Sequence, residues 1–339
     1  MAALRSVTLT PRLESSPLGL GCANLFREPS AKRRLRLLEA AYDCGLIHFD
    51  VAPMYGLGVA EGELGRFAAA RRDRIVIATK FGLAPTRLAR QVARIQAPVR
   101  RLLLARPSLR ERARSSAAGP SSGRGGAALY TKEGYNSRSA RKSLERSLKA
   151  LRTDYLDLLL LHDPEPEDVP PEAIRSFLED AVSRGDIREW GIAGEPEIAF
   201  DVARFFDPRV PIMQVRDDIL TRPPRTLRDD ADFRITFGVL ARPLGTLLAH
   251  LAEPGTRQRW SDATGVDCGS TEELVNFLLR DAVVTNPRGT VLYSSIHEER
   301  IRSAALLANA LPGSPSPGLE AFRGLVDSEL RHATPAADR

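Results

Sequence analysis

Short apolar runs alternate with amphipathic helical stretches along most of the chain, and this repetition constrains the fold more than any other feature of the sequence. Helical patterns between the runs have recognisable ends; Ser30 can cap the first one and Gly45 can terminate it. Such alternation predicts parallel strands joined by crossover helices. The eight apolar runs are LGLGCA (18–23), LIHFDVA (46–52), IVIATKFG (75–82), YLDLLLLHD (155–163), EWGIAG (189–194), PIMQVRD (211–217), ITFGVLA (235–241) and GTVLYSS (289–295).

The fold class that this pattern predicts is α/β, a (β/α)8 TIM barrel forming a single domain over residues 1–339. Eight strand-helix units fit such a barrel in number, and runs such as DLLLLH are apolar at nearly every position, as expected of strands covered on both faces. A doubly wound open sheet is the alternative. Its GxGxxG fingerprint is missing, as is the GxxxxGK[ST] motif of a P-loop, so any nucleotide is expected to bind in another way.

The segment 83–130 interrupts the rhythm after the third strand and is expected to be an insertion. It is far longer than an ordinary connection between a strand and a helix. Its first half has apolar residues near helical spacing, and its second half, SSAAGPSSGRGG, has the composition of a flexible linker. In a barrel, a long loop at this place lies on the catalytic face, where it can act as a lid.

Charge and composition exclude several classes of protein. The net charge of +6 comes from the insertion, which holds ten arginines and one acid, so the rest of the chain is not built for nucleic acid. We expect no membrane span and no signal peptide, because no apolar stretch approaches about 18 residues and the N-terminus lacks an apolar region, and we therefore expect a cytoplasmic protein. Cys22, Cys44 and Cys268 lack metal-binding spacing, so we expect reduced thiols and no metal site.

Four titratable side chains follow the apolar runs at the positions where barrel strands end. Asp50, Lys80 and His162 each close a run, and Tyr55 lies in the loop after Asp50. Because the carboxyl ends of barrel strands converge on one face, we expect the four to meet there. A tyrosine is a weak acid with a pKa near 10, but a neighbouring ammonium can stabilise its phenolate. The set therefore predicts proton transfer, with Lys80 assisting Tyr55, Asp50 orienting the lysine and His162 polarising a carbonyl.

These residues also carry a family resemblance. The stretch HFDVAPMYGLGVAEGELG resembles the D-x-A-x-x-Y-G signature of the aldo-keto reductases, and IVIATKFG, SARKSLERSLKALRTDYLDLLLLHDP and RPLGTLLAH follow in family order. The resemblance implies a barrel that binds a nicotinamide cofactor across its C-terminal face and reduces an aldehyde or ketone. It makes Tyr55 the general acid, with Lys80 and Asp50 lowering its pKa and His162 orienting the substrate.

The same resemblance implies a set of cofactor contacts. Gln214 matches the glutamine that binds the nicotinamide carboxamide, and Arg300 matches the arginine that contacts the adenosine 2′-phosphate, which favours NADPH, with NADH possible. Leu244 and Ser294 complete the cofactor-binding positions that we assign. His48, two residues before Asp50, is expected to have a structural role.

Departures from the family pattern motivate a second hypothesis. Ala193 and Gly194 stand where many members have Ser-Asn, Ala241 and Arg242 stand where a tyrosine stacks on the nicotinamide, and Ser294 replaces a frequent lysine. The alternative function is a cofactor-binding redox sensor or regulatory protein with little turnover. A third hypothesis makes the insertion an anchor for a polyanion. The identity of the carbonyl substrate and the oligomeric state are not readable from the sequence.

Overall fold

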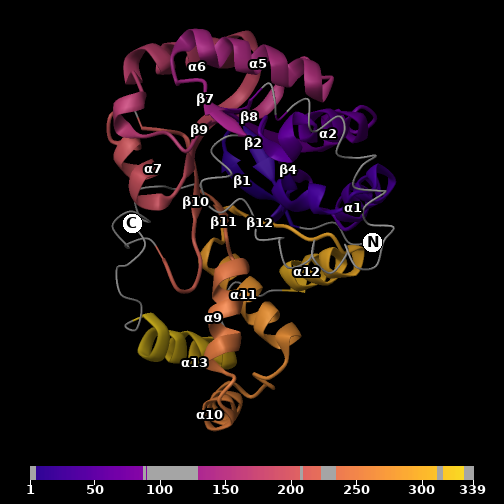
Figure 1. Ribbon diagram of the computed structural model, residues 1–339, viewed down its shortest axis with the longest axis vertical. Helices are drawn as coiled ribbons and strands as arrows, with labels where there is room; N and C mark the ends of the chain where they lie inside the picture. The colour runs from indigo at the N-terminus through magenta and orange to yellow at the C-terminus, as the bar shows by residue number, and fades with distance from the viewer. Residues whose placement is uncertain are drawn as a thin grey trace.

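Eight parallel strands form a closed barrel in the computed structural model, which describes residues 5–86, 89, 129–206, 209–222, 234–310 and 316–331 (Figure 1). Each of the eight apolar runs overlaps one barrel strand, so the predicted fold class is confirmed. Every neighbouring pair in the barrel is parallel. In barrel order the strands are β3 (Leu18–Gly21), β4 (His48–Asp50), β5 (Val76–Phe81), β8 (Leu156–His162), β9 (Ile187–Gly194), β10 (Ile212–Arg216), β11 (Arg234–Phe237) and β12 (Thr290–Tyr293).

Helices surround the barrel, and their ends follow from local sequence signals. Ser30 caps the first helix by accepting a hydrogen bond from the backbone N–H of Arg33, as expected, and Gly185 ends another with a positive φ of 80°. The strand formed by the seventh apolar run, 235–241, ends at Phe237, because Gly238 turns the chain with a φ of 85°. The helices are α1 (Ala31–Asp43), α2 (Ala60–Ala68), α5 (Ser137–Leu151), α6 (Pro171–Arg184), α7 (Pro196–Ala203), α9 (Ala241–His250), α10 (Pro254–Thr264), α11 (Thr271–Thr285), α12 (Glu298–Ala310) and α13 (Pro317–Val326).

The core has an inner and an outer part. The outer part lies between the strands and the helices and holds most of the large apolar side chains. The inner part fills the barrel, and a short hairpin of β1 (Val7–Thr10) and β2 (Leu13–Ser15) contributes to it. Because the hairpin packs with residues at the starts of the barrel strands, it closes the N-terminal end and leaves the opposite end for a site. The inner part comprises Val7, Leu9, Leu13, Val76, Ala78, Leu158, Leu160, Ala193, Ile212, Ile235 and Leu292.

A two-stranded stem forms the base of the insertion. Strands β6 (Leu83–Pro85) and β7 (Tyr130–Lys132) pair antiparallel, and the N–H of Thr86 donates to the carbonyl of Leu129 at 2.9 Å. Its position directly after β5 agrees with the prediction. The predicted helical half and linker of the insertion lie outside the described residues, and so do the hypotheses of a lid or an anchor.

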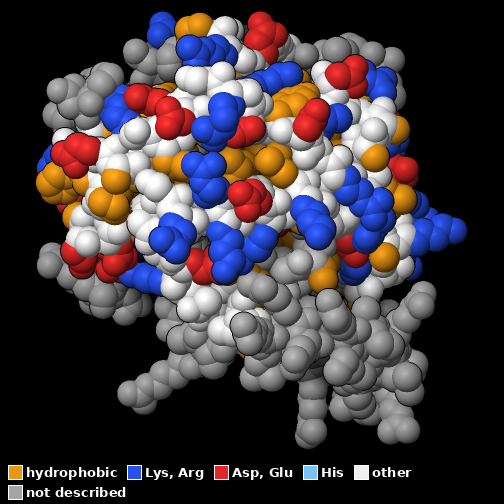
Figure 2. Space-filling view, turned by 90° about the horizontal axis from the view of Figure 1, so that it is seen from above, with side chains coloured by type: hydrophobic (Ala, Val, Ile, Leu, Met, Phe, Trp, Pro, Cys, Tyr) orange, Lys and Arg blue, Asp and Glu red, His pale blue; other side chains and the backbone are white. Residues whose placement is uncertain are grey.

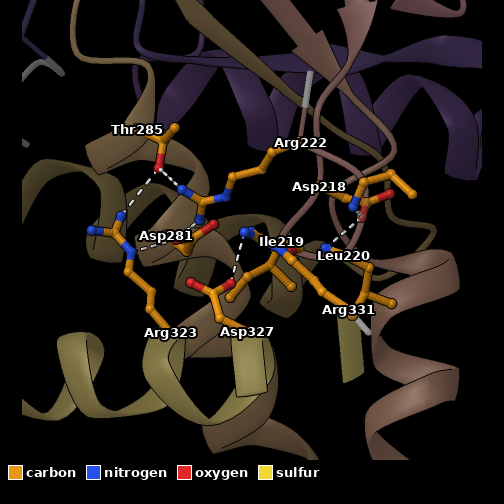
Figure 3. Close-up of polar contacts among 10 residues, drawn as sticks. Asp218, Ile219, Leu220, Arg222, Asp281, Thr285, Arg323, Asp327 and Arg331 are labelled. Atoms are coloured by element: carbon orange, nitrogen blue, oxygen red, sulfur yellow. Dashed lines mark hydrogen bonds and ion pairs between the residues drawn. The ribbon is translucent and has the colours of Figure 1, made fainter. Parts of the chain in front are cut away.

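The C-terminal segment is fastened to the barrel by buried charges (Figure 3). Asp281 of α11 accepts from Arg222, which follows β10, and from Arg323 of α13 at 2.7 Å. Arg331 donates twice to the carbonyl of Ile219, at 2.9 and 2.6 Å. These contacts tie the segment after β10 to the end of the described chain.

The surface carries charges of both signs. On the face in Figure 2, Lys and Arg side chains are intermixed with Asp and Glu side chains, and hydrophobic side chains lie between them. Ion pairs neutralise part of this charge, such as Arg175–Glu179 within α6 and Arg184–Asp186 at its C-terminal end. Within the described ranges, none of the helices combines the length and the apolar character needed to cross a bilayer.

Candidate active site

Three of the four predicted titratable residues lie on adjacent barrel strands at the C-terminal end. Asp50 ends β4, Lys80 is the penultimate residue of β5 and His162 ends β8. Asp50 pairs in register with Ala78, and Lys80 pairs with Leu160. Residues two apart on a strand share a face, so these three side chains point to the same side as Ala78 and Leu160, which belong to the barrel interior.

Lys80 is at the centre of the group and is almost fully buried. Its Nζ donates to both carboxylate oxygens of Asp50 at 2.7 Å, to the carbonyl of Val51 at 3.1 Å and to the hydroxyl of Tyr55 at 3.3 Å. Burial opposes the charge on the lysine, but Asp50 and Tyr55 together outweigh burial and raise the pKa of Lys80. Lys80 is therefore a fixed cation that touches both the carboxylate and the phenol.

A strained turn carries Tyr55 to the lysine. The turn, η2 (Tyr55–Gly58), has positive φ values of 58° at Gly56 and 57° at Leu57. Glycine is needed at 56, because an added Cβ would lie 2.6 Å from the ring of Phe26. A leucine with positive φ is uncommon and costs energy, so the surrounding packing holds the turn in place. This turn holds the phenol of Tyr55 next to the buried Lys80.

The ionisation of Tyr55 differs from the expectation that its neighbours lower its pKa. Burial raises the pKa of Tyr55 to about 12. The charge of Lys80 lowers this pKa as expected, but the charge of Asp50 raises it, contrary to the expectation. The expectation considered the ammonium and not the loss of water around the phenolate, which here is the larger effect. The phenol is consequently protonated at neutral pH, which is the form that can donate a proton to a substrate.

His162 faces the phenol. The two rings are 6.1 Å apart between centroids, at an interplanar angle of 86°. Burial, with the nearby charge of Lys80, lowers the pKa of His162 well below its usual value, so the imidazole is neutral. Its Nδ1 is buried and accepts no hydrogen bond from any residue in the described ranges. A neutral imidazole with a donor at Nε2 can hydrogen-bond a carbonyl oxygen without releasing a proton.

Gln214 lies on the same level of the barrel as His162. His162 pairs in register with Ala193 of β9, and Ala193 pairs with Gln214 of β10. The side chain of Gln214 is buried, and within the described part of the chain its Oε1 has no hydrogen-bond partner. A buried acceptor without a partner is costly, so this amide suits a ligand that brings an N–H group. A nicotinamide carboxamide has this chemistry.

The other residues assigned to a cofactor are more dispersed. Ser294 follows β12, and its hydroxyl donates to the carbonyl of Gly21 at 2.7 Å. Arg300 is exposed in the first turn of α12, and Leu244 is half-buried in α9. Each of these positions follows one of the last two barrel strands, so all three lie after the carboxyl ends of strands.

Two functional candidates near His162 were missed by the sequence analysis. The hydroxyl of Tyr135 donates to the carbonyl of His162 and, at 3.1 Å, to the carbonyl of Asp163. Gly82, with φ 109°, leaves room for the Tyr135 ring, since a Cβ there would lie 2.1 Å from it. The signal for Tyr135 was weak, because it depends on a contact between distant segments. The sequence signal for Asp163 was stronger, because an acidic residue directly follows the histidine that ends a strand.

His48 has the expected structural role. Its Nδ1 is 3.1 Å from the hydroxyl of Ser15, and burial lowers the pKa of His48 to about 3, with a further contribution from Lys80. Its ring also packs against Gly19, where a Cβ would lie 3.1 Å away. Across the described ranges, no group of three or more His, Cys, Asp or Glu side chains is placed to hold a metal ion.

Comparisons with known proteins identify the family of this chain. The model of the aldo/keto reductase family matches residues 17–215. D-threo-aldose 1-dehydrogenase of a Pseudomonas species is 33% identical over 181 residues, which cover 52% of this chain and 49% of that protein. This chain thus spans about half the length of the curated relatives that it matches, or less.

Solved structures share the fold along nearly the whole chain. An aldo-keto reductase from Bacillus halodurans in its holo form has a TM-score of 0.66 and 19% identity, covering 95% of this chain and 96% of its own. An aldo-keto reductase from Klebsiella pneumoniae in complex with NADPH has a TM-score of 0.64 and 18% identity, covering 96% and 95%. With the family match over more than half of the sequence, the barrel topology and the signature residues assembled at its C-terminal end, this chain belongs to the aldo/keto reductase family.

Proposed function

We propose that this protein is an oxidoreductase that reduces an aldehyde or ketone to an alcohol with NADPH. The observation that carries the proposal is the hydrogen-bonded group in which buried Lys80 contacts Asp50 at 2.7 Å and the Tyr55 hydroxyl at 3.3 Å. A protonated phenol held by a fixed cation, opposite a neutral histidine, is suited to protonating a carbonyl oxygen. Family membership supports the same reaction class.

The reaction balances with one hydride and one proton. A nicotinamide cofactor, when bound, would supply the hydride for the carbonyl carbon. The phenol of Tyr55 would give its proton to the carbonyl oxygen. The ammonium of Lys80 stabilises the phenolate that this transfer leaves, and Asp50 keeps the ammonium in position. Nε2 of His162 orients the carbonyl oxygen and polarises the C=O bond. Solvent then restores the proton on Tyr55.

Gln214 is the residue we assign to the nicotinamide end of the cofactor. Its unpartnered Oε1 would accept from the carboxamide, and Ala193 beside it is small enough to leave space. Arg300, exposed in the first turn of α12, would contact the 2′-phosphate and so favour NADPH over NADH. Leu244 and Ser294 would flank the remainder of the cofactor. The NADPH complex of the Klebsiella pneumoniae protein supports this choice of cofactor.

The second candidate function is a cofactor-binding sensor with little turnover. It is favoured by Ala193 and Gly194, whose side chains offer no hydrogen bond to a carboxamide. It is also favoured by Ala241 and Arg242, which are exposed at the start of α9 and neither of which is aromatic. The intact contacts of Tyr55 favour the reductase, because a sensor needs no proton donor beside a buried lysine.

The experiment that separates the two functions is a fluorescence titration of the protein with NADPH and NADH, followed by a panel of aldehydes and ketones. The reductase requires binding together with carbonyl-dependent loss of absorbance at the reduced nicotinamide band. Tight binding without turnover on any carbonyl would support the sensor. If neither nucleotide binds, both functions are wrong.

A further inference from the structure

We propose that Asp163 is a specificity-determining residue that accepts a hydrogen bond from a hydroxyl group on the carbon next to the substrate carbonyl. The preferred substrates would then be α-hydroxy aldehydes or α-hydroxy ketones. This inference rests on the proposed reductase function, because it uses the role of His162 in binding the carbonyl oxygen.

Asp163 is held in an uncommon backbone conformation by contacts on three sides. Its φ is 47°, in the left-handed region that a non-glycine residue enters only at a cost. Its N–H donates to the carbonyl of Ala193 at 2.7 Å, and its own carbonyl accepts from the hydroxyl of Tyr135 at 3.1 Å. The same tyrosine donates to the carbonyl of His162. The turn is therefore built to fix the side chain of Asp163 relative to the imidazole.

Gly194 makes room for the carboxylate. A Cβ at this position would lie 3.3 Å from Oδ1 of Asp163, which is tighter than most such contacts, so a larger residue would press on the carboxylate. Gly194 has an ordinary backbone conformation and is not needed for a turn. The absence of a side chain at Gly194 therefore leaves space for the carboxylate of Asp163 at the end of β9.

The carboxylate is available to a ligand. Oδ2 of Asp163 is 3.8 Å from Nε2 of His162, beyond hydrogen-bond distance, and no residue in the described ranges donates a hydrogen bond to either oxygen. The side chain is 58% exposed, so a substrate can reach it. A nearby cation, Arg216, is itself engaged with Glu195 at 3.0 Å. Asp163 consequently presents a free acceptor beside the nitrogen that binds the carbonyl oxygen.

The position of this acceptor selects the class of substrate. When the carbonyl oxygen is bound at Nε2 of His162, a hydroxyl on the adjacent carbon lies close to that oxygen and can reach a carboxylate 3.8 Å from Nε2. A carboxylate accepts hydrogen bonds only, so it favours a hydroxyl and repels an anionic group at the same place. An alkyl group there would leave the carboxylate partly desolvated without a partner, which costs binding.

The test compares pairs of carbonyl compounds of nearly equal size, in which one member has a hydroxyl group where the other has a methyl group. The pairs are hydroxyacetone with 2-butanone and lactaldehyde with 2-methylpropanal, each assayed with saturating NADPH. We expect the wild-type ratio of kcat/KM to favour the hydroxylated member by about tenfold or more, the effect of one hydrogen bond to a charged acceptor. Asp163→Gly, which accommodates the positive φ, should bring the ratio close to one. Asp163→Asn, which keeps an acceptor oxygen, should give an intermediate ratio.

The control is Glu165→Gln, which removes a negative charge from the same loop, where Glu165 pairs with Lys132 at 3.2 Å. It should leave the ratio unchanged. A wild-type ratio near one, or a ratio that survives in Asp163→Gly, would overturn the proposal. A weaker NADPH affinity in Asp163→Gly with an unchanged ratio would also overturn it and would assign the carboxylate to the cofactor.

A binding measurement separates this proposal from the reductase function. If NADPH binds but none of the carbonyls is reduced, the reductase function fails. Saturation-transfer NMR of 1,2-propanediol and 2-butanol with the NADP⁺-loaded protein then tests Asp163 alone. A stronger signal for the diol that is lost in Asp163→Gly would support the site, and equal signals for the two alcohols would rule it out.

Discussion

Burial decides the ionisation of each residue in the candidate site. The charge of Lys80 is retained because Asp50 lies at 2.7 Å. Burial keeps His162 neutral, with a further contribution from the charge of Lys80, and burial keeps Tyr55 protonated although Lys80 favours its phenolate. Loss of water thus sets the state of both rings, and the ion pair modifies it. The sequence placed these four groups together correctly, since they follow predicted strands. It could not give the pKa direction of Tyr55, which depends on how much water the folded chain excludes.

Removing the lysine should therefore damage more than the chemistry. Lys80→Met leaves the carboxylate of Asp50 buried without its partner, and we expect the free energy of unfolding to fall by about 3–5 kcal/mol. Urea denaturation would measure this loss. In the double variant Lys80→Met, Asp50→Leu the unpaired charge is gone, so much of the stability should return. A single variant as stable as the wild type would show that the pair is not buried as described.

The histidines predict the response of stability to acid. Burial lowers the pKa of His48 to about 3, below its unfolded value of about 6.5, so between these pH values the unfolded chain binds a proton that the folded one does not. The free energy of unfolding should thus decrease as the pH falls below about 6.5. Linkage gives about 1.4 kcal/mol for this one group between pH 7.5 and 5.5.

The comparison of wild type with His48→Asn isolates that contribution. Urea denaturation at both pH values should show a decrease for the variant that is smaller by about this amount, whatever its absolute stability. Parallel decreases in the two proteins would mean that His48 is not buried in its neutral form.

At the scale of elements, the turn after β8 is controlled from the stem of the insertion. Tyr135 follows β7 and holds the carbonyls of His162 and Asp163, and Lys132 of the same stem binds Asp168 at 2.9 Å. The sequence predicted all eight barrel strands from apolar runs. It missed the β6–β7 stem and the β1–β2 hairpin, because short antiparallel pairs depend on register with distant partners rather than on a long apolar run.

Loss of the Tyr135 hydroxyl should impair catalysis more than folding. Tyr135→Phe leaves two carbonyls at the turn without this donor, and we expect kcat/KM for carbonyl reduction to drop by about tenfold as His162 loses its orientation. NADPH affinity should remain close to that of the wild type. The measurement is steady-state kinetics alongside the NADPH titration.

A matched control is Tyr155→Phe, which also removes a phenol that donates to a backbone carbonyl, here that of Arg72 at 3.3 Å. Tyr155 lies just before β8, at the opposite end of the barrel from His162. Its loss should lower stability slightly and leave kcat/KM unchanged. If both variants had equal kinetic defects, Tyr135 would have no particular role in positioning His162.

At the scale of the whole molecule, the closed barrel brings residues from distant parts of the chain to one end. A separate set of charged side chains attaches the C-terminal segment to the rest of the protein. Asp281 joins α11 to Arg222 and to Arg323, so a single carboxylate links three parts of the structure (Figure 3). The overall topology was predictable from the alternation of runs and helices. This attachment was not, because no local pattern in the sequence indicates which arginine meets which acid.

We expect Asp281→Ala to destabilise the protein by about 3 kcal/mol, since two partly buried arginines lose their shared partner. Urea denaturation measures the effect. Asp327→Ala removes an exposed carboxylate that pairs with Arg331 at 2.7 Å, and as a surface pair it should cost less than about 1 kcal/mol. Equal losses in the two variants would contradict the buried position of Asp281.

The central claim is that Tyr55 gives its proton to a carbonyl oxygen. The most direct measurement is NADPH oxidation by an added aldehyde in wild type and Tyr55→Phe, with NADPH affinity titrated in the same samples. Tyr55→Phe keeps the ring and removes the phenolic proton, so the account predicts a similar affinity for NADPH and a rate lower by about two to four orders of magnitude. A variant that binds NADPH and reduces the aldehyde at the wild-type rate would contradict it.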